Sequence, residues 1–273
     1  MKNCLVLVLL GTMLFACESG SVANAEIISR VLDPSQDNTI FSESTNSNAL
    51  GSLYIGRTAQ GGVRRALMQF DIAGNIPAGS IIHSVKLELN QTKLVDNAAR
   101  NFDLHLVTKA WGEGTSFASP GAGGQGAAPT TGDATWSSAM FGNTLWTTLG
   151  GDFVSTTSGT TSIGTGGGFF AFNSQSGMLS DVQSWLSTPG SNFGWLVKMT
   201  DENVSGSARE FSSKNIAPAP KLTIDFTAIP EPSSTLLLVV AATIASRLRL
   251  SRRHTNARTL KTQTNPKNID ACR

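Results

Sequence analysis

Short segments that alternate apolar and polar residues constrain the fold of this chain more than any other feature of its sequence. The alternation is cleanest in Val85–Asn90, Phe102–Leu106 and Leu222–Phe226. A period of two places successive side chains on opposite faces of the backbone, as in a half-buried β-strand. Four further segments are predicted strands: Ile27–Leu32, Thr39–Ser42, Ala66–Ile72 and Gly194–Met199. Clusters of Gly, Asn, Pro and Ser separate the strands and predict turns.

One segment has the spacing of an amphipathic helix instead. Its apolar residues are Met178, Leu179, Val182, Trp185 and Leu186. They recur every three or four positions, so they share one helix face. Ser176 or Ser180 could cap this helix, which we expect to end near Ser187. Many strands and one short helix predict an all-β domain over residues 26–228, a β-sandwich of the jelly-roll type.

Two segments of small residues, 118–132 and 155–168, are predicted to be loops. Both are rich in Gly, Ser and Thr, a composition that buries little apolar surface. A phosphate-binding loop would need a following Lys-Ser or Lys-Thr pair, or a strand–helix frame. The first segment has neither, so we expect no such site there.

Charge is low and unevenly distributed along the chain. Asp, Glu, Lys and Arg make up 15% of it, with a formal net charge of +2. Residues 26–230 hold 12 Lys and Arg against 16 Asp and Glu, a net charge of −4, whereas residues 247–273 hold eight basic residues and one acidic residue. A mildly acidic body without a basic stripe argues against a nucleic-acid partner. The cysteines are Cys4, Cys17 and Cys272, so no disulfide framework holds the body.

The N-terminus has the features of a signal peptide over residues 1–25. Lys2 precedes an apolar run of about 12 residues, which is too short to span a bilayer comfortably. Small residues before Glu26 predict cleavage between Ala25 and Glu26. A lipoprotein site at Cys17 and a buried N-terminal helix are the alternatives.

The C-terminus combines a proline-rich break, an apolar run over residues 234–246 and a basic cluster. The residues outside the run are Pro230, Glu231, Pro232, Arg247, Arg249, Arg252 and Arg253. The run can enter a bilayer while the arginines hold the cytoplasmic side. Over residues 229–253 the segment resembles a PEP-CTERM sorting signal, which implies processing by an exosortase-like membrane peptidase. Unlike such signals, this chain continues for residues 254–273, a basic extension; a plain tail anchor and an unprocessed interaction tail are the alternatives.

An ordered series of short motifs in the body carries a second resemblance. The motifs are Asp37–Ile40, Leu53–Gly56, Arg65–Ile72, Ile76-Pro77, Val85–Leu89, Trp111–Gly114, Asp133–Trp136, Phe211–Ser213 and Pro220–Ile224. Together they resemble the DNRLRE domain family over residues 33–227. This resemblance implies a secreted β-sandwich related to carbohydrate-binding modules, on bacterial surface proteins or beside polysaccharide-degrading modules.

Signals for catalysis or a cofactor are weak. The sequence has no Gly-x-Ser-x-Gly motif, no cysteine nucleophile in the body and no zinc-ligand spacing. A glycosidase needs two carboxylates in one cleft, and Glu113 with Asp133 is the pair we nominate. We predict no enzyme and no cofactor, although such a sandwich can hold a structural calcium ion, with Asp33 and Asp37 as candidate ligands.

A sugar-binding face is favoured over an active site, although packing in the core or as a loop anchor is the alternative for each tryptophan that could line it. Sugars stack on flat aromatic rings, and polar groups orient their hydroxyls. The candidates are Trp111, Glu113, Asp133, Trp136 and Trp146, whereas Trp185 and Trp195 lie in apolar patterns that predict core positions. We therefore expect a secreted or cell-surface protein that binds extracellular polysaccharide or another matrix polymer, after transient membrane insertion through its tail. A structural matrix component without a specific ligand and a polysaccharide-degrading enzyme are the alternatives.

Overall fold

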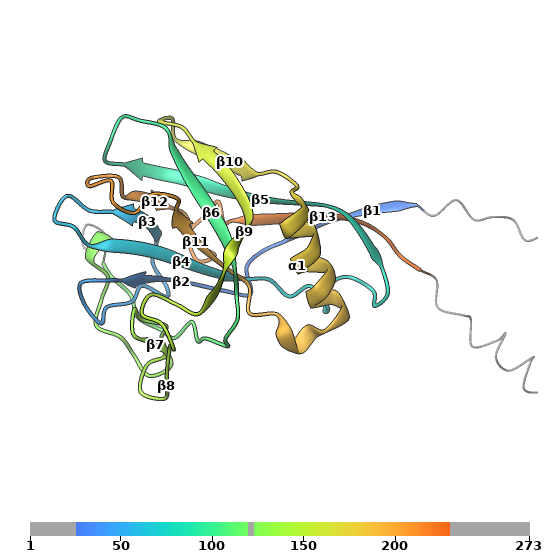
Figure 1. Ribbon diagram of the computed structural model, residues 1–273, viewed down its shortest axis with the longest axis horizontal. Helices are drawn as coiled ribbons and strands as arrows, with labels where there is room; N and C mark the ends of the chain where they lie inside the picture. Colours follow the sequence, from blue (N-terminus) through green and yellow to red (C-terminus); the bar gives the residue numbers. More distant parts are fainter. Residues whose placement is uncertain (1–25, 120–122, 230–273) are drawn as a thin grey trace, which may run out of the picture.

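The computed structural model describes residues 26–119 and 123–229, and within them the chain is built from strands (Figure 1). The strands are β1 (Ile27–Leu32), β2 (Gln36–Phe41), β3 (Leu53–Arg57), β4 (Val63–Gln69), β5 (Ile81–Leu94), β6 (Arg100–Val107), β7 (Ser138–Met140), β8 (Thr144–Leu145), β9 (Phe153–Ile163), β10 (Gly168–Phe172), β11 (Trp195–Met199), β12 (Arg209–Phe211) and β13 (Lys221–Thr227). The helix α1 (Ser176–Ser187) and the 3-10 turns η1 (Gly123–Gln125) and η2 (Pro189–Ser191) complete the described elements.

Eleven strands form one curled antiparallel sheet. Its order is β1-β13-β5-β12-β3-β4-β11-β6-β9, with β10 paired to β5 and β2 paired to β4. The β3–β4 pairing joins two halves, one built around β5 and the other around β4 and β11. Strands β7 and β8 form a separate small hairpin (Figure 1). The prediction of an all-β, sandwich-like fold with one short helix is confirmed.

The main core lies between the two halves of the sheet. Strands β5 and β13 pair Leu87 with Leu222 and Val85 with Ile224, so their apolar residues share the inner face. Phe102 of β6 meets Phe211 of the opposite half edge-on, with ring centroids 6.0 Å apart. Alternate residues of β5 and β13 contribute to this layer, so the alternation in their sequences specifies which face is buried.

Helix α1 packs against β5 and β9 with Met178, Val182, Trp185 and Leu186 buried. The indole rings of Trp185 and Trp195 lie 4.7 Å apart, and both positions are core, as predicted. The predicted serine cap is wrong. The residue before the helix is Gln175, no side chain caps the first turn, and the Gln175 side chain instead bonds to the backbone of Thr160.

Residues 155–168 are not the predicted loop, because most of them form β9, paired with β6. Its threonines are β-branched and therefore favour a strand, here one that is largely exposed on one face. Because the segment has few apolar residues, it lacks the apolar–polar alternation from which strands were predicted. Gly159 lies under the helix, where an added Cβ would approach the sulfur of Met178 to 2.9 Å. Strand β4 also ends earlier than predicted, at Gln69, because Asp71 begins a turn by accepting the N–H of Gly74.

A second apolar cluster lies on the outer face of β2, β4 and β11. Residues 108–119 and 123–152, named here the cover segment, run over this face. Trp111, Ala134, Ala139 and Trp146 of the cover segment pack there on sheet residues that include Leu67. The sheet is therefore buried on both faces in this region, and the cover segment is part of the folded domain.

The predicted signal peptide, residues 1–25, and the predicted sorting segment after Ile229 lie outside the described residues. Within the described part of the chain, no helix has the length and apolarity needed to cross a membrane.

Candidate functional site

The five residues predicted to bind sugar all lie in the cover segment, where two tryptophans are buried. Trp111 is 4% exposed and donates its indole N–H to the carbonyl of Phe193 at 2.8 Å. Trp146 is 6% exposed and donates to the carbonyl of Thr135 at 2.8 Å. Their ring faces are covered, so a sugar cannot stack on either ring in this conformation.

Trp136 is half-buried, and an arginine occupies one face of its ring. The guanidinium carbon of Arg65 lies 4.7 Å from the ring centroid. Two hydrogen bonds of 2.8 and 2.7 Å to the Glu202 carboxylate hold that guanidinium in place. The cation–π contact, with the hydrogen bond that Arg65 donates to the carbonyl of Gly150 at 2.8 Å, attaches the cover segment to β4.

The two nominated carboxylates each hold a separate part of the backbone. Asp133 is fully buried and accepts the N–H groups of Thr115 at 2.8 Å and Thr130 at 2.6 Å. Glu113 accepts the N–H of Asp37 at 3.1 Å and the ammonium of Lys214 at 2.8 Å. Because these contacts occupy both carboxylates, Glu113 and Asp133 do not form a free acid–base pair of the kind that glycoside hydrolysis uses.

Asp37 is the most unusual ionisable group in the described residues. Its Oδ2 accepts the backbone N–H of Lys214 at 2.7 Å, while its buried Oδ1 has no hydrogen-bond partner in the described structure. Burial, with a smaller contribution from Glu113, raises the pKa of Asp37 to about 7. Asp33, the other candidate calcium ligand, is exposed and pairs with Lys221 instead. Among residues 26–119 and 123–229, no three acidic, His or Cys side chains gather as a metal site would require.

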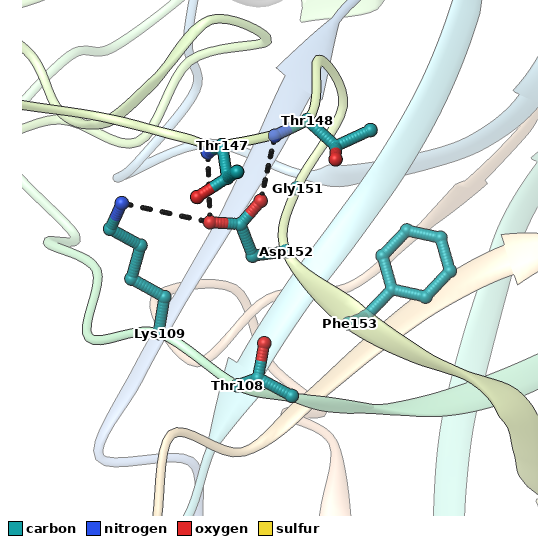
Figure 2. A pocket seen from close by; sticks show the side chains of 7 residues that line it. All are labelled: Thr108, Lys109, Thr147, Thr148, Gly151, Asp152 and Phe153. Atoms are coloured by element: carbon teal, nitrogen blue, oxygen red, sulfur yellow. Dashed lines mark hydrogen bonds and ion pairs between the residues drawn. The ribbon is translucent and has the colours of Figure 1, made fainter.

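A broad polar hollow of about 560 Å³ lies beside the start of β9 (Figure 2). The Asp152 carboxylate accepts the N–H groups of Thr147 at 2.9 Å and Thr148 at 2.8 Å, and the Lys109 ammonium lies 3.6 Å away. Although burial would raise it, these N–H groups lower the pKa of Asp152. The carboxylate is thus already satisfied, and it shapes the turn before β9.

A better site lies on the outer face of the opposite half of the sheet. The strand register places Glu210 of β12 directly between Tyr54 of β3 and Lys93 of β5. Residues directly opposite on neighbouring strands point to the same face, so these three side chains stand in one row. The Lys93 ammonium lies 3.2 Å from the Glu210 carboxylate, which also accepts the hydroxyl of Ser52 at 2.9 Å.

Three adjoining hollows, two of them lined by this row, together form what we call the Tyr54 groove. The central hollow, of about 240 Å³, is lined by Tyr54, Lys93 and Glu210 and by the ends of β4 and β5. It shares these three residues with a hollow of about 310 Å³ that extends to Phe117. It shares Arg64 with a third hollow, of about 600 Å³. The groove therefore continues across the face of the sheet.

The polar groups of the groove are held in place before any ligand arrives. Arg64 lies 4.8 Å from the ring centroid of Phe41, donates to the carbonyl of Gly124 at 2.8 and 3.0 Å, and pairs with Glu43. Burial, assisted by the Glu210 carboxylate, raises the pKa of Tyr54 to about 12. The phenol thus stays protonated at neutral pH and keeps its hydrogen-bond donor.

Exposed apolar side chains flank the row. Phe117 is 53% exposed, and Val95 and Leu50 are also exposed. The groove was not predicted from the sequence, although the sequence contains one signal of it. Tyr54 is the only tyrosine in the chain and lies on the outward phase between Leu53 and Ile55. Its partner Glu210 lies on a strand of three residues, which is too short to show a period.

The comparisons give no relative for this site: no protein-family model matches the chain, and no curated protein matches it.

Proposed function

We propose that this chain is an exported protein of the cell surface or extracellular matrix that binds polysaccharide, without cleaving it, in the Tyr54 groove. The observation that carries the proposal is the row of Tyr54, Glu210 and Lys93, with the exposed ring of Phe117 beside it. An aromatic ring offers a stacking surface, while the Glu210 carboxylate, the exposed Lys93 ammonium and the protonated Tyr54 phenol can orient sugar hydroxyls.

The shape of the groove favours a polymer over a small ligand. Its three hollows adjoin across the face of the sheet, so an extended chain could contact all of them. The resemblance of residues 33–227 to the DNRLRE family supports the same class of ligand.

The proposed route of export rests on the two ends of the sequence. The first strand begins at Ile27, just after the expected cleavage between Ala25 and Glu26. The last strand ends at Thr227, just before Pro230, Glu231 and Pro232. Removal of both predicted segments would thus leave every described strand intact, which suits a surface domain released by an exosortase-like peptidase.

A matched pair of aromatic substitutions tests the groove. Phe117 and Phe169 are 53% and 55% exposed, but only Phe117 lines the groove. On a panel of bacterial and plant polysaccharides, we expect Phe117→Ala to weaken binding about tenfold, equivalent to about 1.4 kcal/mol. Phe169→Ala should leave binding unchanged. Equal affinities of the wild type, Phe117→Ala and Phe169→Ala, or no binding of the wild type to any polysaccharide, would reject the proposal.

The burial of Trp111 and Trp146 favours a second candidate, a structural matrix component without a specific ligand. In that case the tryptophans only hold the cover segment on the sheet. The same panel separates the two functions, because a structural component would retain no polysaccharide while still assembling into matrix.

A further inference from the structure

Three exposed isoleucines lie at one end of the sheet, away from the Tyr54 groove. The strand register aligns Ile27 of β1, Thr227 of β13 and Ile81 of β5 in one row. Their neighbours Ile28, Phe226 and Ile82 face the core, so the row lies on the outer face. Ile27 is 62% exposed, Ile81 is 51% exposed, and Ile229, two residues beyond the row, is 52% exposed. We call Ile27, Ile81 and Ile229 the isoleucine patch.

The patch lies where the described chain both begins and ends. Strand β1 starts at Ile27 and runs antiparallel to β13, so the start of one strand adjoins the end of the other (Figure 1). The predicted apolar run, 234–246, follows Ile229 after four residues. Four residues span at most about 14 Å. If that run enters a bilayer, the patch must lie close to the lipid surface.

A second copy of the chain is a poorer occupant of this edge. Among the described strands β1 pairs with β13 alone, and in that part of the chain its other edge is open to strand addition. However, Arg30 of β1 lies opposite Ile224 of β13, so its side chain points to the inner face of the sheet. At this edge of the sheet the Arg30 side chain is nevertheless exposed to solvent. An inward-facing charge on an edge strand disfavours continuation of the sheet by another strand.

We propose that the isoleucine patch contacts the lipid bilayer while the C-terminal segment anchors the chain in the membrane. The end of the domain that carries the patch then faces the bilayer. The inference rests on the proposed membrane-held precursor. The four residues between Ile229 and the apolar run keep the patch at a high effective concentration beside the lipid. Even weak apolar contacts with the bilayer are then formed for much of the time. Release of the tail would remove the tether and free the domain.

The charges around the patch predict little dependence on anionic lipid. Glu26 precedes Ile27, and Asp225 shares the face of the patch, whereas Arg30 lies on the opposite face of β1, so among the described residues no basic cluster adjoins the patch. Phosphatidylcholine vesicles are therefore a suitable probe.

The experiment uses the full chain in such vesicles, with its three native cysteines replaced by serine. One reporter cysteine is introduced at Ser29, beside Ile27 on β1, and in a matched protein at Ser155 on β9, the opposite end of the sheet order. Both serines are exposed strand residues. With a polarity-sensitive fluorophore attached, we expect lipid-borne quenchers to act several-fold more strongly at position 29 than at position 155. Ile27→Ser with Ile81→Ser should lower quenching at position 29 to the level of position 155.

Three other outcomes would contradict the lipid contact, the membrane-held precursor or the choice of lipid as the occupant of the patch. The protein can resist carbonate extraction from the vesicles and still show equal quenching at both positions. That result would reject the contact between patch and lipid but would support anchoring by the C-terminal segment. Protein that does not associate with vesicles would overturn the contact together with the membrane-held precursor. A disulfide-linked dimer through the Ser29→Cys position would assign the patch to a second copy instead. Polysaccharide binding in the groove is independent of all three results.

Discussion

Asp37 shows how one buried carboxyl group can make stability depend on pH. Its pKa is raised from 3.8 to about 7, chiefly by burial. A folded-state pKa above the unfolded value means that the folded protein binds this proton more tightly. The contribution of Asp37 to stability is thus fully present below about pH 4 and is lost as the pH rises through about 7.

Asp37→Asn tests this dependence. The amide keeps an oxygen that can accept the Lys214 N–H and cannot ionise, so the variant should gain stability relative to the wild type as pH increases. We expect a difference of a few kcal/mol at most between about pH 5 and about pH 8. Thermal unfolding of both proteins at the two values measures it, and comparison with the wild type cancels the other titrating groups. Parallel pH profiles would contradict the assignment.

Asp133 is predicted to be structural because it holds the N–H groups of Thr115 and Thr130 from a fully buried position. Asp133→Ala leaves both donors without this partner and should lower the free energy of unfolding by roughly 2–3 kcal/mol. Denaturant unfolding provides the measurement. Asp71→Ala is the matched control, because Asp71 accepts the N–H of Gly74 in an exposed turn and should cost under about 1 kcal/mol. Equal costs would show that the burial of Asp133 does not matter.

At the scale of single elements, helix α1 depends on its close approach to β9. A Cβ added at Gly177 would meet the carbonyl oxygen of Ser158 at 2.5 Å, whereas one at Gly190 would meet nothing within 4 Å. Replacing glycine by alanine inside a helix normally stabilises it. Here the helix would have to move away from the backbone of β9.

We therefore expect Gly177→Ala to lower the free energy of unfolding by about 1–3 kcal/mol, the usual cost of overpacking. Gly190→Ala, by contrast, should leave it unchanged or raise it slightly by restricting the unfolded chain. Chemical denaturation of the two variants beside the wild type is sufficient. A stabilised Gly177→Ala protein would mean that the helix and β9 are not in contact as described.

The elements that the sequence predicted well are those with a strong period. Val85–Asn90 and Leu222–Phe226 lie within β5 and β13, and the spacing of Met178, Val182 and Trp185 marks α1. Strand β9 was missed because its threonines and serines carry no apolar alternation. Short strands such as β12 contain too few residues for any period to appear.

The candidate site was harder to predict, because it depends on register between distant strands. Tyr54, Lys93 and Glu210 become neighbours only when β3, β5 and β12 pair. The tryptophans of the cover segment are large aromatic residues at strand ends or near glycines, a pattern that also fits a sugar-binding face. Burial of Trp111 and Trp146 by the sheet, a tertiary effect, gives them a packing role instead.

For the complete protein, the described fold and the two end segments together predict where the mature chain begins and ends. The described strands occupy residues 27–227, between the predicted signal peptide and the predicted sorting segment. The secreted protein should therefore begin at Glu26, end near Pro230 and carry no lipid at Cys17. Intact-mass spectrometry of protein from the medium or the cell surface measures the mass of the mature chain, which tests the predicted N- and C-termini together. A full-length mass in the cytosol would contradict export.

If polysaccharide occupies the Tyr54 groove, as we propose, the tyrosine in that groove can report its binding. Because Tyr54 is the only tyrosine, ring-labelled ¹³C-tyrosine gives an NMR signal from this site alone. Titration with a polysaccharide retained on the panel should shift or broaden that signal saturably in the wild type and in Phe169→Ala, and only at higher concentration in Phe117→Ala. An unchanged tyrosine signal while polysaccharide binds would place the binding site elsewhere and contradict the account.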